Sequence, residues 1–171
     1  MYFPFGDSSI IPTYHLFNVI KRNTNVSITG DGGDEIFFGY EAFKGYYLSL
    51  IIKKIVPNFL IRILKLPFSH IDTDDTYMSF KKKIKFFFKY LDNKSYLMNN
   101  YWISNFTDKD SQEYFKRNQK SLFLLKKLFQ KYNDKMKFAQ IYFIKYYLPI
   151  ILSKVDFSSM INSVENRSPY L

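Results

Sequence analysis

One short stretch of the chain combines residue types that could do chemistry, and it spans residues 28–40, ITGDGGDEIFFGY. Its carboxylates are Asp31, Asp34 and Glu35, and its glycines include Gly30, Gly32 and Gly33. Glycine lets a backbone adopt positive φ and approach a ligand closely. Carboxylate oxygens suit Mg²⁺, which commonly bridges acidic residues and phosphates. The stretch therefore predicts a loop that meets a phosphate through magnesium, or that contacts a cationic or hydroxyl-bearing substrate.

A second interpretation of the same stretch needs no ligand. Asp-Gly is a common turn dipeptide, and acids at a helix start are stabilised by the helix macrodipole. Asp34 and Glu35 could serve that purpose alone. A calcium EF-hand is excluded, because its alternating oxygen ligands and distant glutamate do not match this spacing.

The elements that must position this loop are predicted from caps, breakers and hydrophobic pattern. A helix is expected from Ser8 or Ser9 to about Arg22, with one of the two serines as N-cap. Residues 25–29 predict a short buried strand. A second helix is expected from near Asp34 to about Ile55, so the loop would join a strand to a helix N-terminus that offers unpaired N–H groups to a phosphate.

The rest of the chain is expected to be helical, with its aromatic residues packed between helices. Apolar residues at helical spacing predict helices at 57–65, 73–91, 108–119, 121–132 and 137–152. Asp156 could cap a short helix at 157–164. Glu165 and Arg167 could form an ion pair before Pro169.

Composition narrows the classes of protein that fit. The 171 residues are 47% hydrophobic, which suits one domain with a sizeable core. No cysteine is present, so disulfides, thiolate zinc sites and cysteine nucleophiles are excluded. The net charge of +10 invites a nucleic-acid partner. Lysines at 81–89 alternate with phenylalanines, however, as on an amphipathic helix with a solvated face, so we expect no nucleic acid.

The hydrophobic runs are too short for a membrane-spanning helix, and the amino terminus lacks a basic leader before an apolar stretch. We therefore expect no membrane association and a cytoplasmic location.

Three segments in order carry a resemblance to a known family. They are residues 4–13 (PFGDSSIIPT), residues 28–40, and residues 154–171, which contain KVD, SM and ENRSPYL. Together they resemble the synthetase domain of glutamine-hydrolysing asparagine synthetases. The middle, from about residue 53 to 137, is similar only in helical character.

This resemblance implies a ligase with ATP and Mg²⁺ as cofactors and small molecules as partners. In that family the side-chain carboxylate of aspartate attacks the α-phosphate of ATP. Ammonia from glutamine then displaces AMP from the β-aspartyl-adenylate. Relatives of this domain amidate or cyclise other carboxylates, as β-lactam synthetases do, so the acceptor stays open. A basic helical module that binds anionic surfaces is the non-enzymatic alternative.

The resemblance also implies roles for individual residues. Asp31 matches the acid that lies at the reacting carboxylate, and Asp34 is the better match for magnesium pyrophosphate. The residues expected to be catalytic are Asp31, Glu35 and Arg167. Gly30, Gly32 and Gly33 belong to the same nucleotide-binding loop. The segment flanking the amino-acid substrate matches Asp7, Ser8, Ser9 and Thr13. Glu165 and Arg167 match a Glu-x-Arg pair near the active site, in which Arg167 either contacts substrate or supports the site.

Departures from the family pattern are equally specific. Phe38 stands where glycine is usual, Phe157 where arginine is common, and Asn166 where a small apolar residue is usual. The Ser-Gly-Gly-x-Asp-Ser pyrophosphate loop, the cysteine-dependent glutaminase domain and the later catalytic lysine do not occur in the sequence.

We therefore expect residues 1–171 to be an interior piece of the domain that is inactive alone. The parent fold implied is a Rossmann-like α/β domain of the ATP pyrophosphatase type. This piece is expected to keep one or two strands and most of the helices, and to expose apolar faces. Its partner would be the missing remainder of the synthetase or a second copy.

Overall fold

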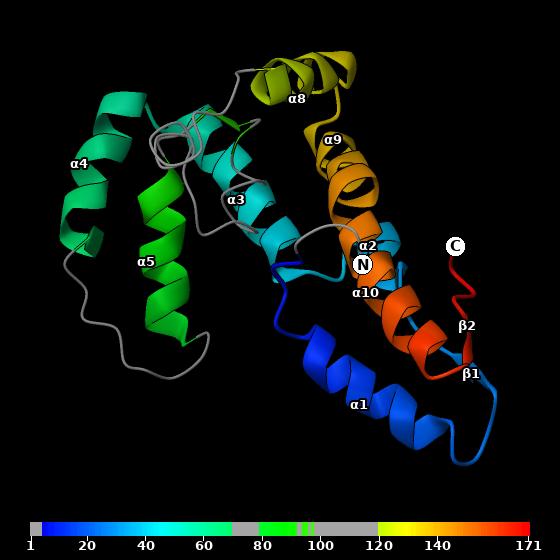
Figure 1. The fold of residues 1–171 in the computed structure, drawn as a ribbon. Helices are drawn as coiled ribbons and strands as arrows, with labels where there is room; N and C mark the ends of the chain where they lie inside the picture. Colours follow the sequence, from blue (N-terminus) through cyan, green and yellow to red (C-terminus); the bar gives the residue numbers. More distant parts are fainter. Residues whose placement is uncertain (1–4, 70–78, 92–93, 96, 98–119) are drawn as a thin grey trace. The chain divides into compact units, whose positions relative to one another are not determined.

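The structure is a computed structural model that describes residues 5–69, 79–91, 94, 95, 97 and 120–171 (Figure 1). Its helices are α1 (Ile10–Ile20), α2 (Gly33–Phe37), α3 (Glu41–Ile55), α4 (Asn58–Ser69), α5 (Phe80–Leu91), α8 (Lys120–Lys131), α9 (Lys135–Tyr142), the π-helix η1 (Phe143–Tyr147) and α10 (Leu148–Ile161). Its strands are β1 (Val26–Ile28) and β2 (Glu165–Arg167). The chain divides into two compact units, one of residues 1–40 and 140–171 and the other of residues 41–139.

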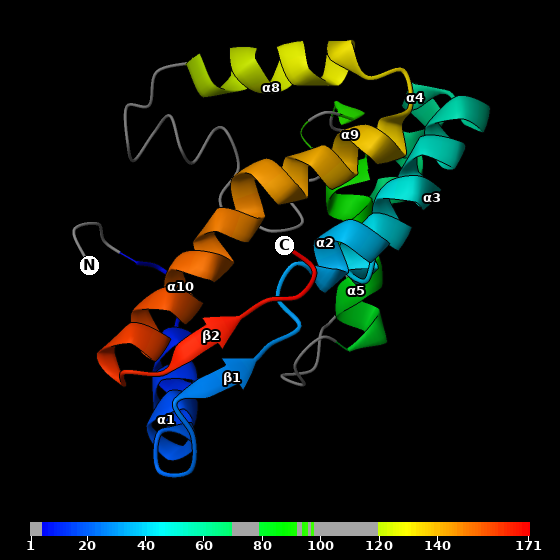
Figure 2. The same cartoon turned by 90° about the vertical axis from the view of Figure 1, so that its right-hand side faces the viewer.

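In the first unit the two strands form a parallel pair (Figure 2). Ser27 lies opposite Asn166 and Ile28 opposite Arg167. The pairing continues beyond the strand ends, because the Thr29 N–H donates to the Arg167 carbonyl at 2.9 Å. The carboxyl ends of the two strands therefore lie side by side, and the loops that follow them begin at the same edge.

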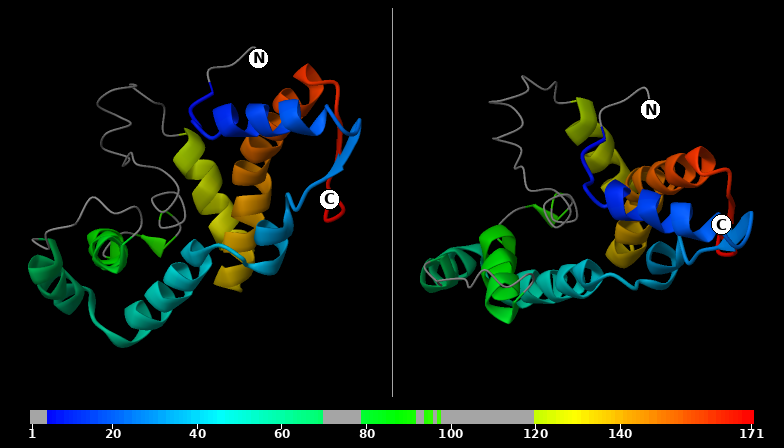
Figure 3. Two further views of the ribbon diagram at one scale, coloured as in Figure 1. Left: turned by 90° about the horizontal axis from the view of Figure 1, so that it is seen from below. Right: turned by 60° about the horizontal axis from the view of Figure 1, so that its bottom comes forward.

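Helices α1 and α10 pack against each other in this unit, with α1 lying across the carboxyl half of α10 (Figure 3). Their shared core contains Phe17, Val155 and Val164. The buried Asn162 amide donates to the carbonyls of Ser158 at 2.8 Å and Tyr14 at 3.3 Å, which ties the end of α10 to α1. This contact fixes the position of the turn between α10 and β2.

The end of α10 is a Schellman motif, in which two N–H groups bond back across the last turn. Ser163 donates to the Met160 carbonyl and Val164 to the Ser159 carbonyl, both at 3.0 Å. Ser163 takes the left-handed position of the motif with φ 54°. The turn aims the chain into β2.

In the second unit α4 and α5 pack around Ile61, Phe87 and Leu91. The rings of Phe68 and Phe88 stack with centroids 3.9 Å apart. The expected role of aromatic residues in packing is confirmed, because buried rings occur in both units. The most enclosed of these rings are Phe17, Phe43, Tyr46, Phe138 and Phe143.

One helix predicted in the second unit begins later than expected, and another lies outside the described residues. The helix predicted at 73–91 begins only at Phe80, because Ser79 precedes it and its hydroxyl accepts the Lys82 N–H at 3.3 Å. The helix predicted at 108–119 lies outside the described residues. Helices α4 and α8 correspond to the predictions at 57–65 and 121–132.

The single helix predicted from Asp34 to Ile55 is wrong, because the chain forms α2 and α3 with a break between them. Phe38 has φ 59°, in the left-handed region, and ends α2. The Gly39 N–H donates to the Asp34 carbonyl at 2.9 Å, which closes the turn. A left-handed residue cannot continue a right-handed helix, so α3 restarts at Glu41.

The carboxyl-terminal prediction is also wrong in two respects. The helix predicted at 137–152 continues through η1 into α10 and ends at Ile161. Asp156 therefore lies inside α10 and caps nothing. Pro149 lies in the first turn of α10, directly after the π-helix η1.

The strand predicted to be buried, β1, is instead partly exposed to solvent, because the Ile28 side chain is 75% exposed. Among the described helices, none combines the length and hydropathy that a membrane crossing requires.

Candidate functional site

The glycine-rich loop after β1 meets the chain after β2 at the carboxyl edge of the strand pair. Gly32 is buried and has φ 88°, and a Cβ there would lie 2.5 Å from Leu171 Cδ2. The ring of Tyr170 packs edge-on against Phe37 with centroids 5.6 Å apart. Two of the three sequence segments, 28–40 and 154–171, are therefore brought together by contact.

Asp31 is held in this loop by Thr29, the residue that directly follows β1. The Thr29 hydroxyl donates to Asp31 Oδ2 at 2.6 Å, and the Asn166 amide nitrogen donates to the Thr29 oxygen at 3.1 Å. Ser27 in turn donates to Asn166 Oδ1 at 3.0 Å. A chain of hydrogen bonds thus runs from both strands to the carboxylate of Asp31.

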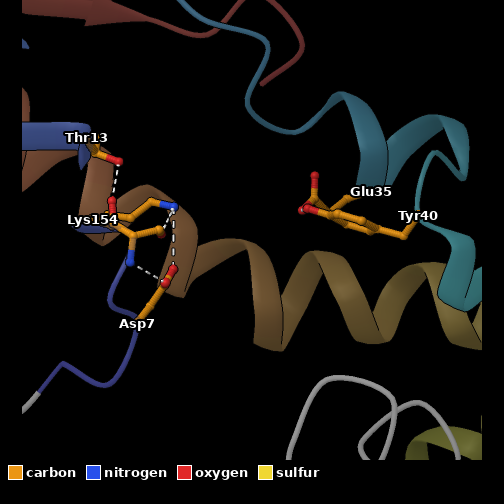
Figure 4. A network of polar contacts seen from close by, with 6 residues as sticks. Asp7, Thr13, Glu35, Tyr40 and Lys154 are labelled. Atoms are coloured by element: carbon orange, nitrogen blue, oxygen red, sulfur yellow. Dashed lines mark hydrogen bonds and ion pairs between the residues drawn. The ribbon is translucent and has the colours of Figure 1, made fainter. Parts of the chain in front are cut away.

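Glu35 is buried, with 1% of its surface exposed, and it accepts a 2.7 Å hydrogen bond from the Tyr40 hydroxyl (Figure 4). The Tyr40 ring stacks on the Phe143 ring with centroids 5.4 Å apart, and it packs edge-on against the Tyr147 ring with centroids 5.7 Å apart. Gln140 donates to the Ile36 carbonyl at 2.7 Å. The loop is therefore clamped onto the π-helical turn η1, and Glu35 points into the protein.

This clamp also perturbs the tyrosine. Burial, and next the hydrogen bond to Glu35, raise the pKa of Tyr40 well above its ordinary value of 10. The hydroxyl therefore stays protonated and able to donate. A π-helical turn inside a longer helix is uncommon and often marks a functional region.

Asp34 is exposed at the start of α2, and its carboxylate lies where a Cβ on Gly39 would be. Among the residues that the structure describes, no three acidic, histidine or cysteine side chains gather as a metal cluster. A single exposed carboxylate still fits Mg²⁺, which commonly keeps several waters and takes one or two protein carboxylates plus phosphate oxygens. Asp34 is thus a suitable protein ligand, and the metal assignment stays a prediction.

Asp7 and Ser9 form a second polar group with Lys154 of α10 (Figure 4). Lys154 Nζ donates to Ser9 Oγ at 2.8 Å and lies 3.5 Å from Asp7 Oδ2. Asp7 Oδ1 accepts the Ser9 N–H at 2.9 Å. The hydrogen bonds with Ser9, and next the charge of Lys154, lower the pKa of Asp7. Asp7 therefore stays ionised beside a largely covered ammonium group.

The same group corrects the predicted cap of α1. Ser9 occupies the N-cap position but its side chain makes no capping hydrogen bond, because its hydroxyl faces Lys154. The carboxylate of Asp7 takes that role through the Ser9 N–H. Thr13 donates to the Ser9 carbonyl at 2.7 Å, whereas Ser8 is exposed.

Arg167 and Glu165 form the predicted ion pair, with Nε and Oε1 2.8 Å apart. Both side chains are exposed on β2, and the pairing raises the pKa of Arg167. The backbone of Arg167 reaches the loop, because its carbonyl accepts a hydrogen bond from the Thr29 N–H.

Several contributors to these groups were not assigned a role from the sequence, among them Thr29, Tyr40, Lys154 and Asn166. Lys154 and Asn166 lie in the resembling segment at 154–171, so that segment was a usable signal. Nothing in the local pattern indicated that Tyr40 would turn back onto Glu35.

Comparison with known proteins gives two matches. The family model for asparagine synthase matches residues 2–171. A curated protein of Methanocaldococcus jannaschii, named "Putative asparagine synthetase (glutamine-hydrolyzing) 2", is 42% identical over 57 residues, which is 33% of this chain and 11% of that protein. The match thus covers about a tenth of the curated relative. No solved structure matches the chain.

Proposed function

Because the chain belongs to the asparagine synthase family, we propose that it forms part of the synthetase site of an ATP-dependent ligase that converts aspartate to asparagine. In this reaction ATP activates the side-chain carboxylate of aspartate as an adenylate, and ammonia from glutamine displaces AMP. The curated relative's name, which refers to glutamine-hydrolysing asparagine synthetase, supports this choice of substrate.

The observation that carries the proposal is the meeting of the loop at 28–40 with residues 168–171 beyond the carboxyl ends of β1 and β2. Ligands of open α/β sheets bind outside the carboxyl ends of parallel strands. Asp31 and the glycines stand at that edge. The Rossmann-like parent fold is part of the same proposal.

The roles proposed for the acidic residues follow their surroundings. Asp31 would orient the reacting groups, because its carboxylate is fixed by Thr29. Asp34 would hold Mg²⁺, which neutralises phosphate charge when it is bound. Glu35, being buried and hydrogen-bonded to Tyr40, would hold the loop in position from the protein interior.

The other proposed contacts come from the family resemblance. Gly30, Gly32 and Gly33 would let the backbone approach the nucleotide. Asp7, Ser8, Ser9 and Thr13 would lie toward the aspartate substrate. Arg167 would support the site through its backbone, because its side chain is paired with Glu165. The remaining partner would be the rest of the synthetase, in the cytoplasm.

The test is aspartate-dependent exchange of labelled pyrophosphate into ATP, measured in a full-length synthetase reconstructed around this chain. Asp34→Asn should abolish the exchange, because it removes the carboxylate proposed to hold Mg²⁺. Glu41→Gln is the matched control, since Glu41 is an exposed acid that pairs with Lys83 in the second unit. Exchange by Asp34→Asn at the parent rate would remove the role proposed for Asp34. No exchange by the parent would remove the proposed function.

A further inference from the structure

We propose that Asn166 is a positioning residue for Asp31: by fixing the hydroxyl of Thr29, it sets the direction in which the Asp31 carboxylate points. The inference rests on the proposed function for the role of Asp31, but the arrangement itself is a property of the hydrogen bonds between β1 and β2. Asn166 lies on β2 directly opposite Ser27, and its side chain reaches along β1 to Thr29.

The direction of each hydrogen bond follows from the donors that are present. An amide nitrogen only donates, an amide oxygen only accepts, and a hydroxyl can do either. Ser27 donates to Asn166 Oδ1 at 3.0 Å. The amide nitrogen of Asn166 donates to the Thr29 oxygen at 3.1 Å. This orientation of the Asn166 amide agrees with the Thr29 hydroxyl, whose own proton is used on Asp31 and whose oxygen is therefore free to accept.

The Thr29 hydroxyl has a single proton, and Asp31 receives it. Thr29 Oγ1 lies 2.6 Å from Asp31 Oδ2, a short bond of the kind that a carboxylate accepts from a hydroxyl. Ser168 Oγ lies 3.3 Å from the same Thr29 oxygen. Because the Thr29 proton is used on Asp31, Ser168 must be the donor in that contact. The Thr29 oxygen thus accepts two hydrogen bonds and donates one.

In this arrangement the Thr29 hydroxyl accepts a hydrogen bond from Asn166 and donates one to Asp31. With the Asn166 nitrogen on one side, the hydroxyl cannot donate back toward β2, because an amide N–H offers no lone pair there. Its proton points to the loop, where it restrains one oxygen of Asp31 at 2.6 Å, because the other possible acceptor, Ser168 Oγ, lies farther away at 3.3 Å. Hydrogen-bonded partners of this kind hold reacting groups within the narrow range of geometry that catalysis needs.

A purely structural role for Asn166, as a rung between the strands, makes a different prediction. The backbone pairing of β1 and β2 does not need the side chain, since Thr29 N–H donates to the Arg167 carbonyl at 2.9 Å and Glu165 N–H to the Asn25 carbonyl at 2.7 Å. Hydrogen exchange of these two amides reports the pairing. The orientation of Asp31 is reported separately by its side-chain couplings.

The experiment is NMR of the labelled full chain, with three-bond couplings measured for the χ1 angle of Asp31. The parent should show one dominant χ1 rotamer. Asn166→Ala and Thr29→Val should both give averaged couplings, while the Thr29 amide stays protected in Asn166→Ala. Asn23→Ala, which truncates an exposed asparagine in a turn, is the control and should match the parent.

A second variant separates orientation from folding. Asn166→Asp has the same shape and still accepts from Ser27, but it offers Thr29 a second acceptor in place of a donor. The Thr29 proton is then shared between two carboxylates, so the χ1 couplings of Asp31 should average. Because aspartate is as large as asparagine, this averaging would not result from a cavity at position 166. Parent-like couplings in both Asn166 variants would overturn the proposal. Loss of amide protection in both would make Asn166 a strand-pairing residue and would overturn it too.

A kinetic arm uses the reconstructed synthetase. Asn166→Ala should lower kcat for exchange on the order of tenfold, the lower end of what outer-shell partners contribute, with KM for ATP unchanged. Added to Thr29→Val, it should cause no further loss, because both act through one hydroxyl. If the parent shows no exchange but the couplings respond, the proposed function fails and the positioning role stands. If exchange occurs and the couplings do not respond, the positioning role fails alone.

Discussion

Tyr40 turns back over five residues to donate a 2.7 Å hydrogen bond to the buried carboxylate of Glu35. The left-handed turn at Phe38 makes this return possible, because it separates α2 from α3. Phe143 and Tyr147, which belong to the π-helical turn η1, hold the Tyr40 ring in place. The position of the loop acids thus depends on a helix more than a hundred residues further along the chain.

Tyr40→Phe should lower the free energy of unfolding by about 1.5–3 kcal/mol, because a hydrogen bond to a buried charged group is lost while the ring stays. Tyr47→Phe is the matched control, since Tyr47 is exposed on α3, and it should change stability by less than about 0.5 kcal/mol. Urea unfolding followed by circular dichroism measures both. Equal effects of the two changes would show that the Tyr40 hydroxyl contributes nothing.

Stability should fall at alkaline pH, partly through Tyr40. Its pKa is higher in the folded chain than in the unfolded chain, because burial and Glu35 favour the neutral hydroxyl. The resulting stabilisation is complete below about pH 10, the ordinary pKa of tyrosine, and is lost as the pH rises above it. Burial likewise raises the pKa of Tyr142 to about 12.

The measurement is the urea midpoint at pH 8, 10 and 11. The parent should lose stability between pH 10 and pH 11 more steeply than Tyr40→Phe, so the difference between them should shrink. Tyr142→Phe should flatten the decline in the same way. Parallel curves for the parent and Tyr40→Phe would contradict the assigned cause.

Gly32→Ala should be destabilising by roughly 1–2 kcal/mol, because Gly32 has φ 88° and an alanine pays the left-handed cost there. The added methyl also meets Leu171, which must move away. Gly30→Ala is the control in the same loop, since a Cβ there meets nothing within 4 Å. Thermal unfolding compares the two. A Gly32→Ala protein as stable as Gly30→Ala would mean that the loop does not take this turn.

Phe38→Gly should be more stable than Phe38→Ala by about 1 kcal/mol. Both changes remove the ring, so their difference isolates the backbone at φ 59°. Denaturant midpoints of the two variants provide the comparison. A Phe38→Ala protein equal to Phe38→Gly would indicate that this residue is not left-handed in solution.

Local signals in the sequence determined much of the secondary structure and the location of the candidate loop. Caps, breakers and periodicity predicted α1, α4 and α8, and the strand at β1, to within a few residues. These signals act between neighbours in the chain, so they can be found without knowing the fold. The glycines and acids of residues 28–40 were recognisable for the same reason, and the family assignment they suggested is confirmed.

What only the tertiary structure decided is which distant residues meet. Local signals did not predict the break between α2 and α3, the π-helical turn or the extension of α10 through Asp156. The same holds for the pairing of Lys154 with Asp7 and for the link from Asn166 to Asp31. The Lys154–Asp7 contact and the Asn166–Thr29 contact each bring together side chains about 140 positions apart in the sequence. A hydrogen bond depends on distance and angle in space, which spacing along the sequence does not specify.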